Sequence, residues 1–127
     1  MSKTAVRTES APAPFQGAPY NQAIVANGLV FVSGQGPLDT SGKLGEGDIA
    51  AATQQTFDNL AAILEAAGSS LEKVVKANVY LADLGEFAAM NEVYKERMPA
   101  PHPARTTIQA AALPGGITVE IDVIALA

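Results

Sequence analysis

The chain has 127 residues, a formal net charge of −5 and no cysteine. This length fits one domain, and a domain of about this size buries roughly two thirds of the surface that its unfolded chain exposes. The lack of cysteine excludes disulfides and thiolate zinc sites, and a single histidine, His102, argues against a transition-metal cluster. The eight basic residues are scattered, so a nucleic-acid surface, which needs clustered Lys and Arg, is not expected.

The first 14 residues are polar and then proline-rich, without the apolar segment of a secretory signal. No stretch of the chain approaches the ~20 apolar residues of a membrane span. We therefore expect a cytoplasmic protein with no membrane partner. Residues 1–127 would form a single domain, in which residues 1–13 are an arm of uncertain order.

Two β-prone runs, residues 22–26 and 29–33, are separated by Asn27-Gly28. This dipeptide predicts a tight hairpin, because Asn and Gly both accept the positive φ of a type I′ turn. The following segment, residues 34–47, contains five glycines and is expected to be a loop.

Two amphipathic helices are expected. Asp48 is positioned to cap the first, which runs to about residue 67, with Gly68 as its left-handed stop. Asp83 and Glu86 resemble a capping box that opens the second helix, which ends near residue 97. The apolar spacing of the second helix is carried by Phe87, Met90, Val93 and Tyr94.

Three further strands are predicted. Residues 74–81 alternate, with Val75, Ala77, Val79 and Leu81 on one side. Residues 105–113 and 117–126 flank a Pro114-Gly115-Gly116 turn, and a proline-rich loop precedes the first of them.

The element order is therefore β-β-α-β-α-β-β, an α+β arrangement in which both helices lie on one face of the sheet. Apolar residues would remain exposed on the other face: Val30, Val32, Tyr80, Ile124 and Leu126. Since such exposed patches usually mark an interface, we infer that several copies pack sheet against sheet in a closed ring.

Two charged residues at strand positions offer chemistry. Arg105 begins a strand, and its planar guanidinium matches a carboxylate bidentately, a contact that contributes about 1.5–3 kcal/mol. A surface salt bridge is the alternative interpretation. Glu120 lies mid-strand and could orient water or exchange a proton, whereas an exposed polar edge or a structural ion pair fits equally well.

Weaker candidates lie near the first hairpin. The Tyr20 hydroxyl could bind a substrate, although a packed ring is the commoner outcome. Ser33 and Gly34 end a strand in a glycine-rich turn whose N–H groups could face a ligand, but the spacing is not that of a phosphate loop. A serine nucleophile would need His102 as its base, and the proline neighbours of His102 indicate a loop residue instead.

Several segments in combination resemble the Rid family, also called YjgF or L-PSP endoribonuclease. The resemblance covers about residues 14–127. The matching segments are Gly17-Ala18-Pro19-Tyr20-Asn21-Gln22-Ala23, Ser33-Gly34-Gln35-Gly36-Pro37-Leu38, Gly47-Asp48-Ile49, Asn91-Glu92-Val93-Tyr94, Pro103-Ala104-Arg105-Thr106-Thr107 and Val119-Glu120-Ile121.

The resemblance implies a chorismate-mutase-like fold with a mixed sheet, assembled as a homotrimer with sites in the clefts between subunits. It implies hydrolysis of reactive 2-imino or enamino acids to 2-keto acids and ammonia, without cofactor or metal. The arginine matching Arg105 binds the substrate carboxylate, the glutamate matching Glu120 positions the attacking water, and the tyrosine matching Tyr20 completes the catalytic group. The substrate-binding positions correspond to Ser33, Gly34, Asn91 and Thr107.

This chain departs from the family pattern in two segments next to the expected site residues. The family often has Ser-Cys after the arginine, whereas this chain has Thr106-Thr107, and Gly17-Ala18-Pro19 carries an extra alanine. A side chain that shapes the pocket at position 107 would shift substrate preference.

Two other functions remain open. One is a non-enzymatic trimer that binds a small carboxylate. The other is the RNA cleavage of the older family label, against which the acidic charge and the lack of a histidine pair argue. The expected partner is a small imino or keto acid rather than a nucleic acid.

Overall fold

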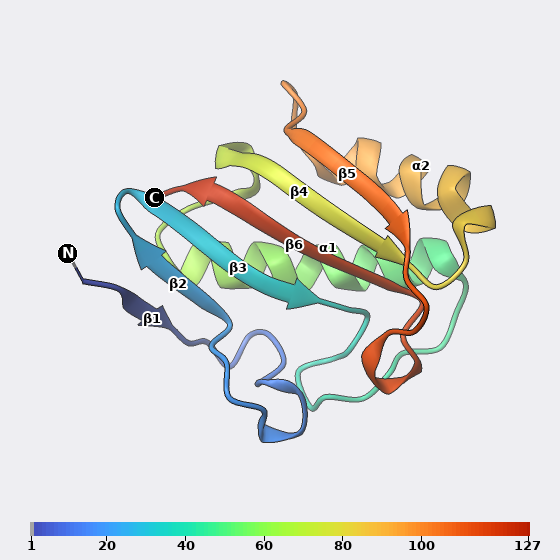
Figure 1. Cartoon of the computed structure of the whole chain (residues 1–127), viewed down its shortest axis with the longest axis horizontal. Helices are drawn as coiled ribbons and strands as arrows, with labels where there is room; N and C mark the ends of the chain where they lie inside the picture. The colour runs from blue at the N-terminus through green and yellow to red at the C-terminus, as the bar shows by residue number, and fades with distance from the viewer. Residues whose placement is uncertain (1) are drawn as a thin grey trace.

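A six-stranded mixed sheet covered on one face by two helices forms the protein, as seen in a computed structural model that describes residues 2–127 (Figure 1). The sheet order is β1-β2-β3-β6-β4-β5, in which β4 and β5 are parallel and the other neighbours antiparallel. The strands are β1 (Thr4–Val6), β2 (Ala23–Ala26), β3 (Leu29–Gln35), β4 (Val74–Leu81), β5 (Ala104–Gln109) and β6 (Val119–Leu126). The α+β fold and the predicted element order are confirmed, with β1 added at the sheet edge.

The N-terminal arm is docked onto the sheet. Its strand β1 pairs with β2, and the buried amide of Gln22 holds the segment that follows. Gln22 Oε1 accepts from the Thr8 N–H at 2.7 Å, and Nε2 donates to the carbonyls of Ala11 and Pro12 at 3.3 and 2.8 Å. A three-residue strand is too short to show an alternating pattern, so the sequence did not predict β1.

The predicted hairpin joins β2 to β3. Asn27 and Gly28 adopt positive φ values of 52° and 76°, as the Asn-Gly signal requires. The glycine-rich segment that follows β3 crosses the end of the sheet and leads into the first helix (Figure 1).

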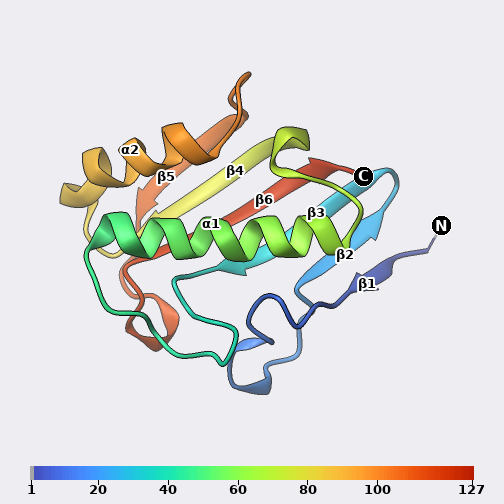
Figure 2. The ribbon, with the colours of Figure 1, turned by 180° about the vertical axis from the view of Figure 1, so that it is seen from behind.

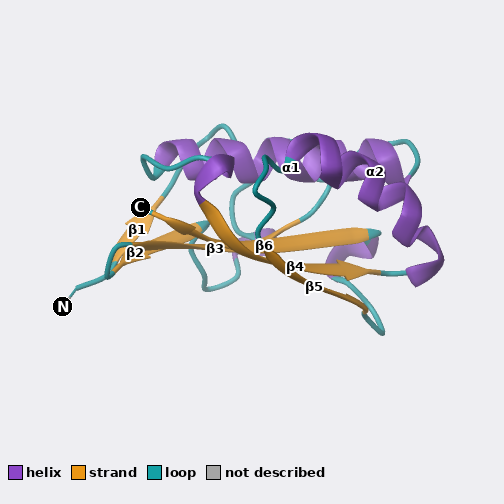
Figure 3. Cartoon of the chain, turned by 90° about the horizontal axis from the view of Figure 1, so that it is seen from above, coloured by secondary structure: helices purple, strands orange, loops and turns teal. Residues whose placement is uncertain are grey.

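The two helices are α1 (Ile49–Ala66) and α2 (Phe87–Arg97), and both lie on the same side of the sheet (Figures 2 and 3). Asp48 caps α1 as predicted, since its Oδ1 accepts from the Ala51 N–H at 3.0 Å. Asp83 caps a 3₁₀ turn rather than α2 itself, which begins at Phe87. No helix among the described residues is long and apolar enough to cross a membrane.

Core packing occurs between α1 and the covered face of the sheet. The side chains of α1 that are fully buried there are Phe57, Leu60, Ile63 and Leu64. The sheet contributes fully or almost fully buried residues from its three central strands: Val30, Ala77, Val79, Leu81, Val119, Ile121, Val123 and Ala125. This one-sided core matches the 3.6-residue pattern of the helix and the two-residue pattern of the strands.

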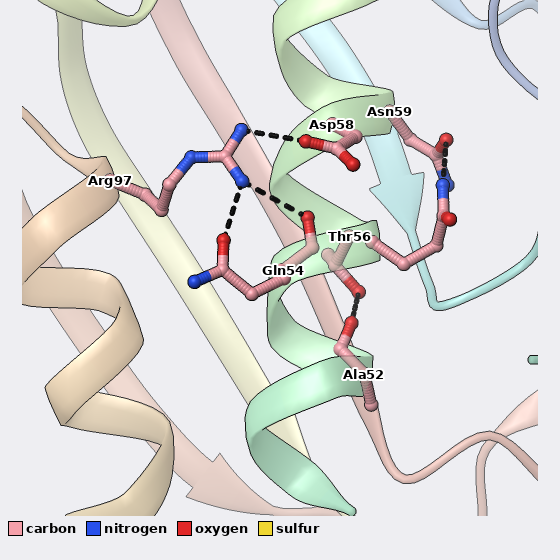
Figure 4. Close-up of polar contacts among 7 residues, drawn as sticks. Ala52, Gln54, Thr56, Asp58, Asn59 and Arg97 are labelled. Carbon is pink, nitrogen blue, oxygen red and sulfur yellow. Dashed lines mark hydrogen bonds and ion pairs between the residues drawn. The ribbon is translucent and has the colours of Figure 1, made fainter. Parts of the chain in front are cut away.

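Arg97 joins the two helices (Figure 4). Its guanidinium donates to Asp58 Oδ1 at 2.9 Å and to Gln54 Oε1 at 2.7 Å, and it lies over the Phe57 ring at 5.6 Å. Because the Asp58 side chain is 61% exposed, this ion pair contributes little stability and mainly fixes the position of α2.

The prediction that Val30 and Val32 lie on the uncovered face is wrong. They pair with Ala125 and Val123 and are buried beneath the helices. Phe31, between them, lies on the uncovered face, as does Leu29, which pairs with Leu126. All of residues 29–32 are apolar, so the sequence carried no polar residue to mark the outer face.

The prediction that Val75 shares one side of its strand with Ala77, Val79 and Leu81 is also wrong. A shift in the β4–β6 pairing between Val74 and Lys76 inserts a bulge, so Val74 takes the inward position and Val75 is 43% exposed. The remaining alternation holds. The uncovered face, called the open face below, carries the apolar residues Phe31, Tyr80, Ile108, Ile124 and Leu126.

Candidate functional site

A cavity of about 390 Å³ opens where β3 leaves the sheet. Four of the predicted site residues line it together: Tyr20, Ser33, Gly34 and Glu120. The rest of its wall comes from the loop after the arm, the loop after β3 and the turn before β6: Pro12, Ala13, Phe15, Ala18, Gln35, Gly36, Leu38, Pro114 and Ile117. The cavity therefore has a polar side at the sheet and an apolar side formed by loops.

A β-bulge shapes the polar side. The β3–β6 pairing shifts between Val32 and Gln35. Two residues of β3, Ser33 and Gly34, therefore lie opposite a single residue of β6. A Cβ atom added at Gly34 would lie 2.8 Å from the Glu120 side-chain carbon Cδ. Only glycine lets the backbone of β3 approach the Glu120 carboxyl this closely.

Glu120 is the second residue of β6 rather than a mid-strand residue, and it projects on the open face, opposite Tyr80 on β4. Partial burial raises the pKa of the Glu120 carboxyl, and the negative charge of Asp122, two residues along the same face, raises it further. Asp122 itself accepts from Asn78 Nδ2 at 2.8 Å. A carboxylate with a raised pKa is a stronger base, which suits it to take a proton from water.

Hydrogen bonds within the chain fix Tyr20 and Ser33. The Tyr20 hydroxyl oxygen accepts from the Phe15 N–H at 2.6 Å, and Ser33 Oγ donates to the Asn21 carbonyl at 2.6 Å. The tyrosine O–H can still donate to a ligand, and the serine oxygen can still accept.

Asn59 fixes the loop after β3 that lines the cavity, a role that the sequence did not predict. Its side chain is 1% exposed, and Nδ2 donates to the carbonyls of Gly36 and Leu38 at 2.9 and 2.8 Å. Its Oδ1 accepts from Gln55 Nε2 at 3.0 Å (Figure 4). In the sequence, Asn59 stands among the polar residues of an amphipathic helix, a position that normally faces solvent.

Arg105 lies in a different place, between β5 and α2. It pairs with Ala77 of β4 and therefore faces the helix layer. Its guanidinium carbon is 4.6 Å from the ring centroid of Tyr94 and 5.5 Å from that of Phe87. Among the described residues 2–127, the one ion pair within 4.0 Å is Arg97–Asp58, so Arg105 has aromatic neighbours but no carboxylate partner.

Three buried oxygen atoms near Arg105 lack hydrogen-bond partners within residues 2–127: Asn91 Oδ1, Tyr94 OH and Thr107 Oγ1. Asn91 precedes Tyr94 by three residues on α2, and Thr107 follows Arg105 by two on the same face of β5. Buried polar atoms almost always have partners. Their position beside a guanidinium without a carboxylate partner makes this region a candidate binding site.

Phe87 and Tyr94 were predicted only as core positions of α2, and the structure gives them a second role. They flank the guanidinium, and Phe87 remains 40% exposed. A helical apolar pattern cannot distinguish a ring that packs in the core from one that also supports a charged side chain.

His102 is exposed in the proline loop, and no three His, Cys, Asp or Glu side chains within residues 2–127 are grouped as metal ligands.

The profile of the family described as Endoribonuclease L-PSP matches residues 8–127. The chain belongs to this family, the Rid/YjgF family. It is 51% identical to "Protein mmf2, mitochondrial" of Schizosaccharomyces pombe, over 86% of this chain and 88% of that protein. It is 44% identical to "Reactive Intermediate Deaminase A, chloroplastic" of Arabidopsis thaliana, over 98% and 66%. The crystal structure of E. coli TdcF with bound serine matches with a TM-score of 0.90 and 34% identity, over 98% of each chain.

In this Rid-family chain the predicted site residues form two groups on opposite faces of the sheet. The first, called the glutamate half, comprises Tyr20, Ser33, Gly34 and Glu120. The second, called the arginine half, comprises Phe87, Asn91, Tyr94, Arg105 and Thr107. Arg105 shares its face with Ala77 beneath the helices, and Glu120 shares its face with Tyr80 on the open side. One chain therefore does not bring Arg105 and Glu120 together.

Proposed function

We propose that this Rid-family protein hydrolyses reactive 2-imino or enamino acids to 2-keto acids and ammonia. The observation that carries the proposal is the arginine half: a guanidinium without a carboxylate partner, beside buried oxygen atoms without partners. Such a group is suited to bind a small carboxylate. The serine bound to TdcF is a small carboxylate, and the Arabidopsis relative is named as a deaminase of reactive intermediates.

The site would be completed by a second copy of the chain. Arg105 and Glu120 lie on opposite faces, so a cleft that contains both needs the arginine half of one copy beside the glutamate half of another. The open face supplies apolar side chains for such an assembly, including Phe31 at 41% and Leu126 at 51% exposure. A homotrimer with one cleft at each interface satisfies both requirements.

In the mechanism, Arg105 pairs with the substrate carboxylate while Phe87 and Tyr94 hold the guanidinium plane. This charge-assisted contact contributes about 1.5–3 kcal/mol and orients C2 of the substrate. Fixing C2 beside a held water removes several kcal/mol of the barrier, on the order of a well-oriented intramolecular reaction.

Glu120 takes a proton from the water as its oxygen attacks C2 of the C=N bond. Glu120 passes this proton to the substrate nitrogen, which gives a tetrahedral carbinolamine. Glu120 then takes the proton of the new hydroxyl group and passes it to the nitrogen as the C–N bond breaks, so ammonia leaves and the C=O bond of the 2-keto acid forms. The Tyr20 hydroxyl and the backbone N–H groups near Gly34 are positioned to donate to the substrate. Each step uses only side chains, backbone and water.

The test is an amino-acid dehydratase assay in which semicarbazide traps the free imine. Added protein should lower the amount of trapped imine and speed the release of keto acid. Arg105→Ala should reduce both effects at least about 100-fold, because the carboxylate loses its charged partner. Arg7→Ala, which removes the same charge from an exposed position in the arm, is the matched control and should stay active. An active Arg105→Ala variant contradicts the proposal.

A second candidate is carboxylate binding without turnover, favoured by the bound serine of TdcF. Calorimetry with serine or 2-ketobutyrate, together with no acceleration in the dehydratase assay, would select it. The cytoplasmic location also stays a prediction, since the two relatives above are named for the mitochondrion and the chloroplast.

A further inference from the structure

The apolar side of the cavity includes one aromatic residue, Phe15. It lies in a short 3₁₀ turn, Phe15–Gly17, within the loop between the arm and β2. This is the loop in which the chain carries an extra alanine before Pro19. Phe15 lines the cavity together with Leu38, Pro114 and Ile117.

Hydrogen bonds hold this loop in one conformation. The Phe15 N–H donates to the Tyr20 hydroxyl at 2.6 Å, and the Phe15 carbonyl accepts from the Ala18 N–H at 3.0 Å. The preceding carbonyl, that of Pro14, accepts from the Gly17 N–H at 3.1 Å. Phe15 therefore belongs to a fixed wall rather than to a free loop tip.

The ring of Phe15 packs against the turn before β6. A Cβ atom added at Gly115 would lie 3.0 Å from Phe15 Cζ and 3.1 Å from Cε1. Gly115 also has a φ of 69°, a conformation that side chains other than glycine rarely adopt. The tip of the ring thus closes the space between two loops that are a hundred residues apart in sequence.

The charges around the cavity restrict what fills it. Of the described residues that line it, Glu120 is the one charged side chain, and none is Lys or Arg. Arg105 of a second copy would be paired with the substrate's 2-carboxylate, so an acidic side chain in the cavity would meet the Glu120 carboxyl and no cation from the same chain. An apolar side chain would instead lie against Phe15, Leu38 and Pro114.

We infer that Phe15 is a specificity-determining residue: its ring limits the length of an apolar substrate side chain that lies in the cavity. This inference rests on the proposed hydrolysis of 2-imino acids and adds the class of side chain. The accepted substrates carry short or medium apolar side chains, and acidic imino acids are excluded.

The experiment supplies imines of different size from a broad amino-acid oxidase with catalase, and semicarbazide traps what the protein does not hydrolyse. The measured quantity is the ratio of kcat/KM for the imine of phenylalanine to that for the imine of alanine. Phe15→Ala should raise this ratio by about tenfold or more, and Phe15→Trp should lower it. A ratio within one variant does not depend on the fraction of protein that is folded.

Leu44→Ala is the control, because Leu44 is 48% exposed and lines a separate cavity. It should leave the ratio unchanged. An unchanged ratio in Phe15→Ala, or acceleration of the imine of glutamate by the unmodified protein, would overturn the inference while the hydrolytic function stands. If the unmodified protein accelerates none of these imines, the proposed function itself fails.

Discussion

The two halves of the candidate site differ in how complete they are. In the glutamate half, Tyr20 and Ser33 have hydrogen-bond partners within the chain, and the cavity has a defined wall. In the arginine half, Asn91, Tyr94 and Thr107 each have a buried oxygen without a partner in the described chain. One chain therefore forms the wall of the cavity, whereas the proposed carboxylate site keeps buried oxygen atoms that can bond to a group from outside the chain.

The aromatic neighbours of Arg105 fit this difference between the two halves. A carboxylate neighbour would fix the guanidinium equally well but would occupy its hydrogen-bonding edge. A cation–π contact with Tyr94, whose ring centroid is 4.6 Å from the guanidinium carbon, needs no carboxylate and leaves the charge available to an external anion.

The largest expected effect comes from recombining the two halves. Arg105→Ala and Glu120→Gln variants should each be inactive when pure. If each site takes its arginine and its glutamate from different copies, an equimolar mixed assembly should regain about one quarter of the full activity, by random pairing around a closed ring.

The measurement is imine hydrolysis after the two variants are denatured and refolded together, with each variant refolded alone as the control. If both residues of a site came from one chain, every site in the mixture would lack one of them. Mixed assemblies that remain as inactive as the separate variants would therefore contradict the two-copy site.

A smaller effect is expected from disturbing the glutamate half alone. Gly34→Ala adds a Cβ atom 2.8 Å from Glu120 Cδ, which forces the carboxyl away from the bulge. A displacement of about 1 Å in a catalytic group can cost on the order of 100-fold in rate, so kcat should fall by roughly 10- to 100-fold.

Gly45→Ala is the matched control, because its added Cβ meets only the Pro37 carbonyl at 3.8 Å. Circular dichroism and thermal unfolding show whether both variants keep the fold. Equal activity in the two folded alanine variants would mean that the close approach of Gly34 to Glu120 is not needed.

The sequence predicted the polar members of both halves, but not the aromatic residues Phe87 and Tyr94 and not the separation of the two halves. The family motifs contain Arg105, Glu120 and Tyr20, so these residues could be found without a structure. Their faces depend on the register between β4, β5 and β6, which no local pattern specifies. A bulge at Val75 illustrates the difficulty, since one inserted residue reverses the side on which a strand residue points.

The same limit applies to residues that act through packing. Helix caps, tight turns and strand bounds follow from local chemistry, which is why the Asp48 cap, the Asn27-Gly28 turn and the bounds of β4 were predicted correctly. Asn59 and Phe15 make contacts with segments distant in sequence, and nothing in their own neighbourhoods indicates those contacts.

The smallest predicted effect concerns the pH dependence of the glutamate half. Burial, and then the charge of Asp122, raises the pKa of Glu120 above its ordinary value. Since the proposed base is the carboxylate, activity should fall as pH drops through that raised pKa. Tyr80, which also faces Glu120, stays neutral in this range because burial and Asp122 raise its pKa too.

Asp122→Asn should shift this acid limb to lower pH. Removing a negative charge favours the ionised form of a neighbouring carboxyl, and this direction holds whether or not a cation from another copy lies nearby. Asparagine keeps an oxygen that can accept from Asn78, so the strand contact is preserved and the rate at neutral pH should change only by about a few-fold. An acid limb of kcat/KM that Asp122→Asn leaves in place would show that a group other than Glu120 controls it.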